Sequence, residues 1–80
     1  MVLKFYFIPN METFTALVAA SCGKVMVRRD EAFQSLKGDG DALAFVKEKT
    51  ARGRSVEIHV SDTRDYFSFV RFMVGACLYN

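Results

Sequence analysis

Histidine, proline and cysteine are scarce in this chain of 80 residues, which has one His, one Pro and two Cys and lacks Trp. A lone His among scattered carboxylates has no recognisable metal-ligand spacing, so we expect neither a metal site nor a cofactor. Cys22 and Cys77 lie far apart, which excludes a C-x-x-C pair, and two cysteines are too few for a disulfide framework. We interpret both as buried thiols of a protein from a reducing compartment.

Charge of one sign is not in large excess either, because 11 basic residues oppose 9 acidic ones and the net charge is +2. A nucleic-acid module normally carries many more Lys and Arg, so we expect no nucleic-acid partner. The longest apolar-rich stretch, Tyr66 to Tyr79, contains Arg71 and is shorter than the ~20 residues of a membrane span. With no secretory signal visible, these features predict a soluble cytoplasmic protein without a membrane partner.

Apolar side chains are what the chain has in quantity: they make up 51% of the residues and include eight Phe. That composition excludes intrinsic disorder, and the length predicts one domain spanning residues 1–80. Alternating patterns predict strands at residues 2–8, 24–29, 32–36 and 54–60. Helical spacing predicts helices at about 11–22, 42–51 and 63–78, with Asn10 and Asp62 or Thr63 as N-caps and Gly23 and Gly53 as stops.

The strand alternation also predicts which side chains face the core. In the first strand these are Leu3, Phe5 and Phe7, and in the last strand Val56, Ile58 and Val60, while Glu57 and His59 face outward. Leu17 and Val70 complete the predicted core. The element order β-α-β-β-α-β-α belongs to the α+β class and predicts a two-layer open-faced sandwich: a four-stranded, mainly antiparallel sheet with three helices on one face.

The strongest loop pattern is Lys37-Gly38-Asp39-Gly40-Asp41. Its glycines and aspartates suggest a phosphate or calcium loop, but no G-K-[S/T] follows and no suitably spaced acidic ligands are present. We interpret it as the loop that leads into the second helix, with Asp39 or Asp41 as the cap.

With these loop lengths, the chain resembles the HPr family, the small phosphocarriers of the sugar phosphotransferase system. The likeness lies in Leu36-Lys37, in Asp41 to Val46 and in Ala51 to Ile58, which resemble the family's second helix and the Gly-x-x-Val-x-Ile strand after it. The run from Asp62 to Asp65 resembles the acidic turn that opens the family's last helix. As topology the resemblance covers nearly the whole chain, and it implies an HPr-like fold.

The departures from the family bear on function. The family's first helix opens with Gly-x-His-x-Arg-Pro, and its histidine is phosphorylated, whereas the matching segment here is Pro9-Asn10-Met11-Glu12-Thr13-Phe14. Asn10 falls near the place of the missing histidine, and Glu12 would repel a phosphate. Asp41 falls where a kinase phosphorylates a serine in some members. The comparison implies a degenerate member without phosphocarrier chemistry, and hence no enzyme activity.

The predicted function is therefore that of a docking or regulatory domain for a protein partner, such as a phosphotransferase component or a regulator. The family docks partners with its first two helices, which implies a face at their two starts: Asn10, Met11, Glu12, Phe14, Asp41, Ala42 and Phe45. One alternative is an active phosphocarrier with a relocated site at His59, which we otherwise interpret as a surface histidine. Another is a ferredoxin-like dimer or RNA-binding module, which would need stacking aromatics on the open sheet face, where only Tyr6 qualifies.

The last helix is apolar on nearly every face. If Phe67, Val70, Val74, Cys77 and Leu78 form the stripe that faces the core, four large side chains are left over. We predict that these four form a homodimer interface or a second docking site: Tyr66, Phe69, Phe72 and Met73.

Two basic spots complete the sequence pattern. Lys24, Arg28 and Arg29 form one, and Arg52, Arg54 and Arg64 form the other. We interpret both as solvated surface charge.

Overall fold

The computed structural model of the chain describes residues 1–8, 10–38 and 40–79, and its described side chains end at Val74. Four strands and three helices form the fold: β1 (Val2–Phe5), α1 (Met11–Ala20), β2 (Val25–Arg29), β3 (Ala32–Ser35), α2 (Gly40–Ala51), β4 (Val56–Val60) and α3 (Thr63–Tyr79). The predicted roles of Asp39 as a cap and of Cys77 and Leu78 as core side chains fall outside this description.

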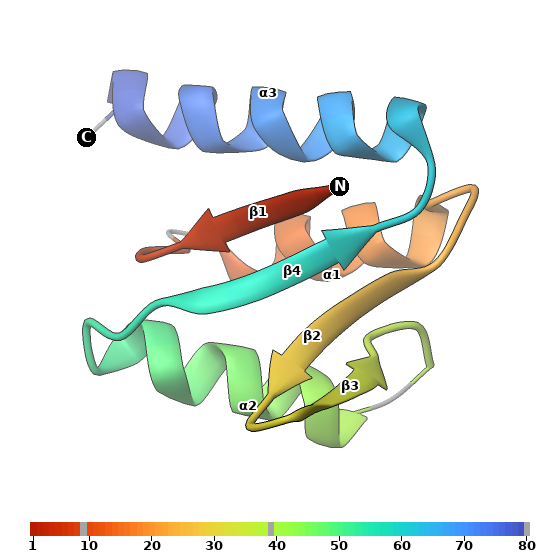
Figure 1. Cartoon of the computed structure of the whole chain (residues 1–80). Coiled ribbons are helices and arrows are strands. Elements are labelled where there is room, and N and C mark those ends of the chain that lie inside the picture. Colours follow the sequence, from red (N-terminus) through yellow and green to blue (C-terminus); the bar gives the residue numbers. More distant parts are fainter. Residues whose placement is uncertain (9, 39, 80) are drawn as a thin grey trace.

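The sheet has the strand order β1-β4-β2-β3, and every pairing among the described strands is antiparallel. Ile58 in β4 lies opposite Leu3 on one side and Val27 on the other. These three residues are buried beneath the helices, whereas the residues that alternate with them, such as Lys4, Glu57 and His59, lie on the open face. Four antiparallel strands with three helices confirm the predicted fold class (Figure 1).

This strand order determines the directions of the helices. β1 and β2 run the same way with β4 between them, so α1, which connects them, runs back in the opposite direction. α2 connects β3 to β4 in the same manner, but these two strands run opposite to β1 and β2. α1 and α2 are therefore antiparallel, as Figure 1 shows, and the start of each lies near the end of the other.

Three phenylalanine rings form the centre of the core between the sheet and the helices. The ring centroids of Phe5 and Phe14 are 5.6 Å apart, and Phe69 lies 6.3 Å from Phe5 and 5.7 Å from Phe14. Edge-on and tilted contacts of this kind add to the burial of the rings. Val56 and Ile58 are buried as predicted, and Leu17 and Val70 pack against this cluster while half-buried.

Three predictions about burial are wrong. Cys22 is exposed, whereas the sequence suggested a buried thiol. Phe7 is 57% exposed, because β1 ends at Phe5 and the alternation stops there, and Ile8 is buried in its place. In α3 the predicted stripe is also misplaced: Phe69 is only 1% exposed and belongs to the core, whereas Phe67 and Val74 are 54% and 52% exposed. Tyr66, Phe72 and Met73 are partly buried and pack against the core. The side of α3 that faces the core is therefore the side that was expected to be exposed.

Backbone conformation explains two of the turns, whereas the end of α1 differs from the prediction. Gly53 has φ +74°, the left-handed conformation expected where it ends α2, and Asp30 has φ 58° in the two-residue β2–β3 turn. Gly23, however, does not end α1, which stops at Ala20. A Cβ on Gly23 would lie 2.5 Å from the Ser61 side-chain oxygen, so this glycine is needed for space.

Candidate functional site

A shallow apolar groove of about 530 Å³ runs between α1 and α2 on the outer side of the helix layer. Small side chains form much of its lining, and Met11 and Leu43 add larger apolar surface. One acidic and one basic residue also line it. We call this surface the α1–α2 groove, and its lining residues are Met11, Glu12, Thr15, Ala16, Ala19, Leu43, Ala44 and Lys47.

The capping and packing of α1 determine which side of this helix lines the groove. Asn10 caps the helix, since its side-chain Oδ1 accepts a hydrogen bond from the Thr13 N–H at 3.1 Å. Phe14 and Val18 then point into the core, which leaves Ala16 and Ala19 on the outer side. Alanines at these positions leave the helix backbone close to the surface, so another chain can approach it closely.

The structure brings only part of the predicted docking face together. Met11 and Glu12 line the groove, but Phe14 and Ala42 are fully buried and cannot contact a partner. Asp41 lies in the first turn of α2, and the antiparallel helices place this turn away from Asn10.

Phe45 also lies elsewhere. It is on the opposite side of α2 from the groove, where Arg29 and Lys49 cover its ring. The two helix starts therefore do not form a single surface. The alanine spacing in α1, together with the helix directions, could have indicated the lining residues that were missed: Thr15, Ala16, Ala19, Leu43, Ala44 and Lys47.

The chain matches no family model, no curated protein and no solved structure. Within the part of the chain that the structure describes, no three His, Cys, Asp or Glu side chains gather closely enough to hold a metal ion. None of the helices, over the same described residues, has the length and apolarity needed to cross a bilayer.

His59 lies on the open face of the sheet, as its strand parity predicts. Its Nε2 is 3.1 Å from Glu57 Oε1, and its ring meets the edge of Phe33 with centroids 4.6 Å apart. The other carboxylate oxygen of Glu57 is 3.4 Å from Arg28 Nη1. Glu57 thus contacts Nε2, one of the two ring nitrogens that could accept a phosphoryl group.

The open face also differs from an aromatic RNA-reading surface. The central strands are β4 and β2, and their outward residues are Glu57, His59, Met26 and Arg28. Tyr6 is exposed but lies beyond the end of β1, and Phe33 is on the edge strand β3. The two rings therefore do not form the paired stacking platform on central strands that RNA-reading sheets use.

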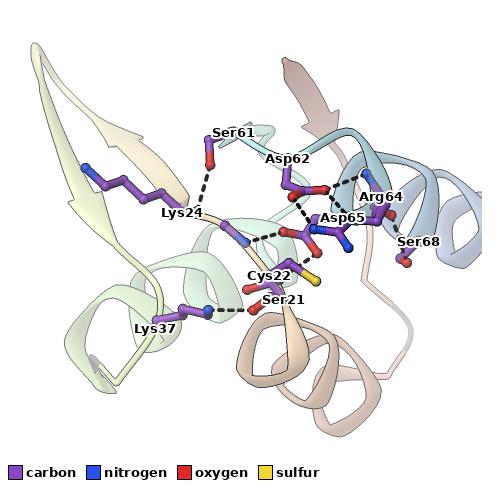
Figure 2. A network of polar contacts seen from close by, with 10 residues as sticks. Ser21, Cys22, Lys24, Lys37, Ser61, Asp62, Arg64, Asp65 and Ser68 are labelled. Carbon is purple, nitrogen blue, oxygen red and sulfur yellow. Dashed lines mark hydrogen bonds and ion pairs between the residues drawn. The ribbon is translucent and has the colours of Figure 1, made fainter.

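A polar network that the sequence did not indicate ties the start of α3 to the loop between α1 and β2 (Figure 2). The Asp65 carboxylate is 5% exposed and accepts hydrogen bonds from the backbone N–H groups of Cys22 at 2.9 Å and Gly23 at 2.8 Å. Next to it, the Ser61 hydroxyl oxygen accepts the Lys24 N–H at 2.8 Å. We call this region, comprising residues 21–24 and 61–65, the polar end.

The cap of α3 belongs to the same end. Asp62 Oδ1 accepts the Arg64 N–H at 2.8 Å, and its Oδ2 is 2.9 Å from Arg64 Nη2. These hydrogen bonds to Arg64, with the charge of its guanidinium, lower the pKa of Asp62 to about 2. The same pair raises the pKa of Arg64. Asp62 rather than Thr63 is therefore the cap, and its role is structural.

Proposed function

We propose that this chain is a non-enzymatic docking domain that binds an amphipathic helix of a partner protein in the α1–α2 groove. The observation that carries the proposal is the apolar lining of this groove, with alanines on the α1 side and Met11 and Leu43 as larger contacts. Apolar side chains that line an open groove offer a surface that another chain can cover.

The dimensions favour a helix as the occupant. α1 has 10 residues and is thus about 15 Å long, which can seat two to three turns of a second helix. Small residues allow the two backbones to approach closely, and the flexible Met11 side chain can adjust to the occupant. Glu12 and Lys47 offer polar contacts beside the apolar lining.

We also propose that the resemblance to the HPr family reflects a shared evolutionary origin. On this view the chain is a degenerate relative that has kept the helix layer for docking and has lost phosphotransfer. Two features support it: the element order β-α-β-β-α-β-α, and Asn10 acting as a helix cap near the place of the missing histidine. The partner would then be a phosphotransferase component or a regulator.

A titration with a designed helix tests the docking proposal. The probe is a helical peptide of about three turns with Leu at positions i, i+3, i+4 and i+7, and the readout is the backbone amide NMR spectrum of the protein. We expect saturable shifts at Thr15, Ala16, Ala19 and Ala44. Shifts confined to the open sheet face or to α3, or no saturable shifts at all, would contradict the proposal.

Two substitutions of exposed alanines provide the matched control. Ala16→Arg places a long cation in the groove, whereas Ala20→Arg adds the same charge to α1 outside the lining. We expect Ala16→Arg to weaken peptide binding at least about tenfold, which is about 1.4 kcal/mol, and Ala20→Arg to leave it unchanged. Equal effects of both variants would show that charge, not the groove, controls binding.

Phosphotransfer separates this proposal from the phosphocarrier alternative. Incubation with phosphoenolpyruvate and the general phosphotransferase enzyme should leave the mass of the chain unchanged. Glu57 beside His59 supports this expectation, because a carboxylate opposes an incoming phosphate. A gain of one phosphoryl group on His59 would establish the alternative instead.

A specific observation also favours self-association through α3, as a second proposal. Phe67 and Val74 are two turns apart, so they share one side of the helix, and both are more than half exposed. We propose that this side, rather than the side with Phe69, contacts a second copy. Light scattering at micromolar concentration should give a dimer that Phe67→Ser with Val74→Ser converts to a monomer. A monomer in both cases would rule this out.

A further inference from the structure

A second hollow, distinct from the groove, opens where β2 ends and β4 begins. Its volume is about 500 Å³, within the range of small-molecule sites. Three elements of the fold contribute its basic side chains: β1, β2 and α2. We call this hollow the basic pocket, and its cations are Lys4, Arg28, Arg29 and Lys49.

The charges in the basic pocket do not balance. Its lining includes two acidic side chains, Asp30 and Glu57, against four cations, which leaves a surplus of two positive charges. That surplus equals the net charge of the whole chain, +2. The charged residues outside the pocket therefore balance, with seven basic against seven acidic, and the pocket accounts for the net positive charge of the chain.

Two of the cations are held by neutral partners. The Arg29 guanidinium carbon lies 4.8 Å from the centre of the Phe45 ring, and Lys49 Nζ lies 5.5 Å from the same point. Arg29 Nη1 also donates to Gln34 Oε1 at 3.1 Å. An aromatic ring and an amide orient these cations without cancelling their charge. The pocket thus presents positioned positive charge, which is the property of an anion site.

The basic surface continues past Phe45. An adjoining hollow of about 110 Å³ shares Phe45 and Lys49 with the basic pocket and adds Arg52 and Arg54. Arg52 is paired with Glu48 at 3.1 Å, which leaves Arg54 to extend the positive field. The two basic spots of the sequence are thereby joined here through Arg28, Arg29, Arg52 and Arg54, while Lys24 and Arg64 lie at the polar end.

We infer that the basic pocket binds the phosphate group of a small phosphorylated molecule. A phosphate monoester carries about −1.5 to −2 charges at pH 7, which matches the surplus of two, whereas one carboxylate would leave a positive charge unmatched. The planar fork of Arg29 suits the oxygens of a phosphate, whereas Arg28 is already bonded to Glu57 and to the Asp30 carbonyl oxygen and adds charge to the pocket. Its volume leaves room for an organic group beside Ser55, Val56 and the Phe45 ring. This site faces away from the α1–α2 groove and does not depend on the docking proposal.

A titration of the isotope-labelled protein with a nucleoside 5′-monophosphate, with the matching nucleoside and with inorganic phosphate tests this inference. We expect the monophosphate to shift the amides of Lys49, Ser55 and Glu57 saturably, inorganic phosphate to shift them more weakly, and the nucleoside to leave them unchanged. Acetate at the same ionic strength should have no effect. Saturable binding of the nucleoside alone, or no saturable shift with any phosphate, would overturn the inference.

Two further arms test the source of the phosphate. Vesicles of phosphatidylcholine containing phosphatidic acid, and a single-stranded RNA oligonucleotide, present phosphate on a membrane and on a polymer. Binding to either one without binding of the free monophosphate would overturn the assignment to a small molecule.

Charge-matched variants separate a built site from general electrostatic attraction. Arg29→Gln and Lys24→Gln lower the net charge equally, but only Arg29 lies in the pocket, and both side chains are exposed. We expect Arg29→Gln to weaken the monophosphate at least tenfold and Lys24→Gln to change it less than twofold, with equal melting temperatures. Equal losses in the two variants would mean that net charge alone attracts the anion, and the inference would fail.

Discussion

The two ends of strand β4 show opposite ways of using charge. At its C-terminal end, the polar end, the carboxylates have partners within the chain: Asp65 has two backbone N–H groups and Asp62 has Arg64. At its N-terminal end, the basic pocket contains Arg29 and Lys49, which a ring and an amide orient but do not neutralise. The same small sheet thus has one end whose polar groups hold the chain together and one whose charges remain available to a ligand.

This difference separates structural from functional polarity. A buried carboxylate is tolerated only when its hydrogen bonds are made, so Asp65 is costly to replace and offers little to a ligand. Exposed cations with neutral partners contribute little to folding and can be changed cheaply. Matched substitutions at the two ends should therefore change the free energy of unfolding by different amounts, and even with opposite signs.

The largest effect is expected for Asp65→Ala. The substitution leaves the N–H groups of Cys22 and Gly23 without their acceptor in a half-buried place, and it removes two charge-assisted hydrogen bonds. We expect the free energy of unfolding to fall by about 3 kcal/mol or more, measured by urea denaturation. Asp65→Asn keeps one acceptor oxygen and should lose less. A loss under about 1 kcal/mol for Asp65→Ala would show that its hydrogen bonds do not hold the polar end together.

A smaller loss is expected for Gly23→Ala. The new Cβ would lie 2.5 Å from the Ser61 side-chain oxygen and 3.0 Å from Asp62 Cβ, so the loop must shift and weaken its bonds to Asp65. Overpacking of this kind costs about 1–3 kcal/mol. Gly40→Ala is the control, because Gly40 begins α2 and, among the described residues outside its own helix backbone and its chain neighbours, none has an atom within 4 Å of an added Cβ. That variant should be neutral or slightly stabilised, and equal losses at both glycines would contradict the steric account.

The fold was predictable because its information is local and periodic. Alternation identified the four strands, and Asn10, Asp62 and Gly53 marked helix boundaries by their capping chemistry. Phe7 and Phe69 were misplaced for a shared reason: apolar residues occupy more than one face there, so pattern alone cannot say which face is covered. Only the end of β1 and the packing of α3 against Phe5 and Phe14 decide it.

The surfaces were less predictable because they depend on which elements become neighbours. The two helix starts were expected to form one docking face, and the antiparallel course of α1 and α2 separates them. Arg29 and Arg54 belonged to two basic spots in the sequence, and the fold joins these through Phe45 and Lys49. Asp65 carries no sequence motif for its role, since its partners are backbone groups more than 40 residues away along the chain.

The pairing of Asp62 with Arg64 makes the stability of the polar end depend on pH. Because the pKa of Asp62 is lowered from 3.8 to about 2 in the folded chain, its pairing stabilises the fold fully above the unfolded value. The contribution is lost as the pH falls from about 4 towards 2. Thermal unfolding across this range should show a steeper decline for the native chain than for Asp62→Asn, which keeps an acceptor but no titrating charge. Parallel curves would show that Arg64 does not lower this pKa.

The smallest effects come from a pair of lysines that compare the two ends directly. Lys37 Nζ donates to the Ser21 carbonyl oxygen at 2.6 Å beside the polar end, so Lys37→Met should lose up to about 1 kcal/mol. Lys49→Met removes the same charge from the basic pocket while keeping most of the apolar stem. This substitution relieves repulsion among the neighbouring cations, so we expect the free energy of unfolding to be unchanged or to rise by up to about 0.5 kcal/mol at low salt.

The gain from Lys49→Met should vanish at about 1 M salt, where the screening length falls to about 3 Å. The loss in Lys37→Met should persist, because a direct hydrogen bond is screened less. If Lys49→Met instead loses as much stability as Lys37→Met at both salt concentrations, the lysines of the basic pocket help to hold the fold, and the contrast between a structural and a ligand-binding end disappears.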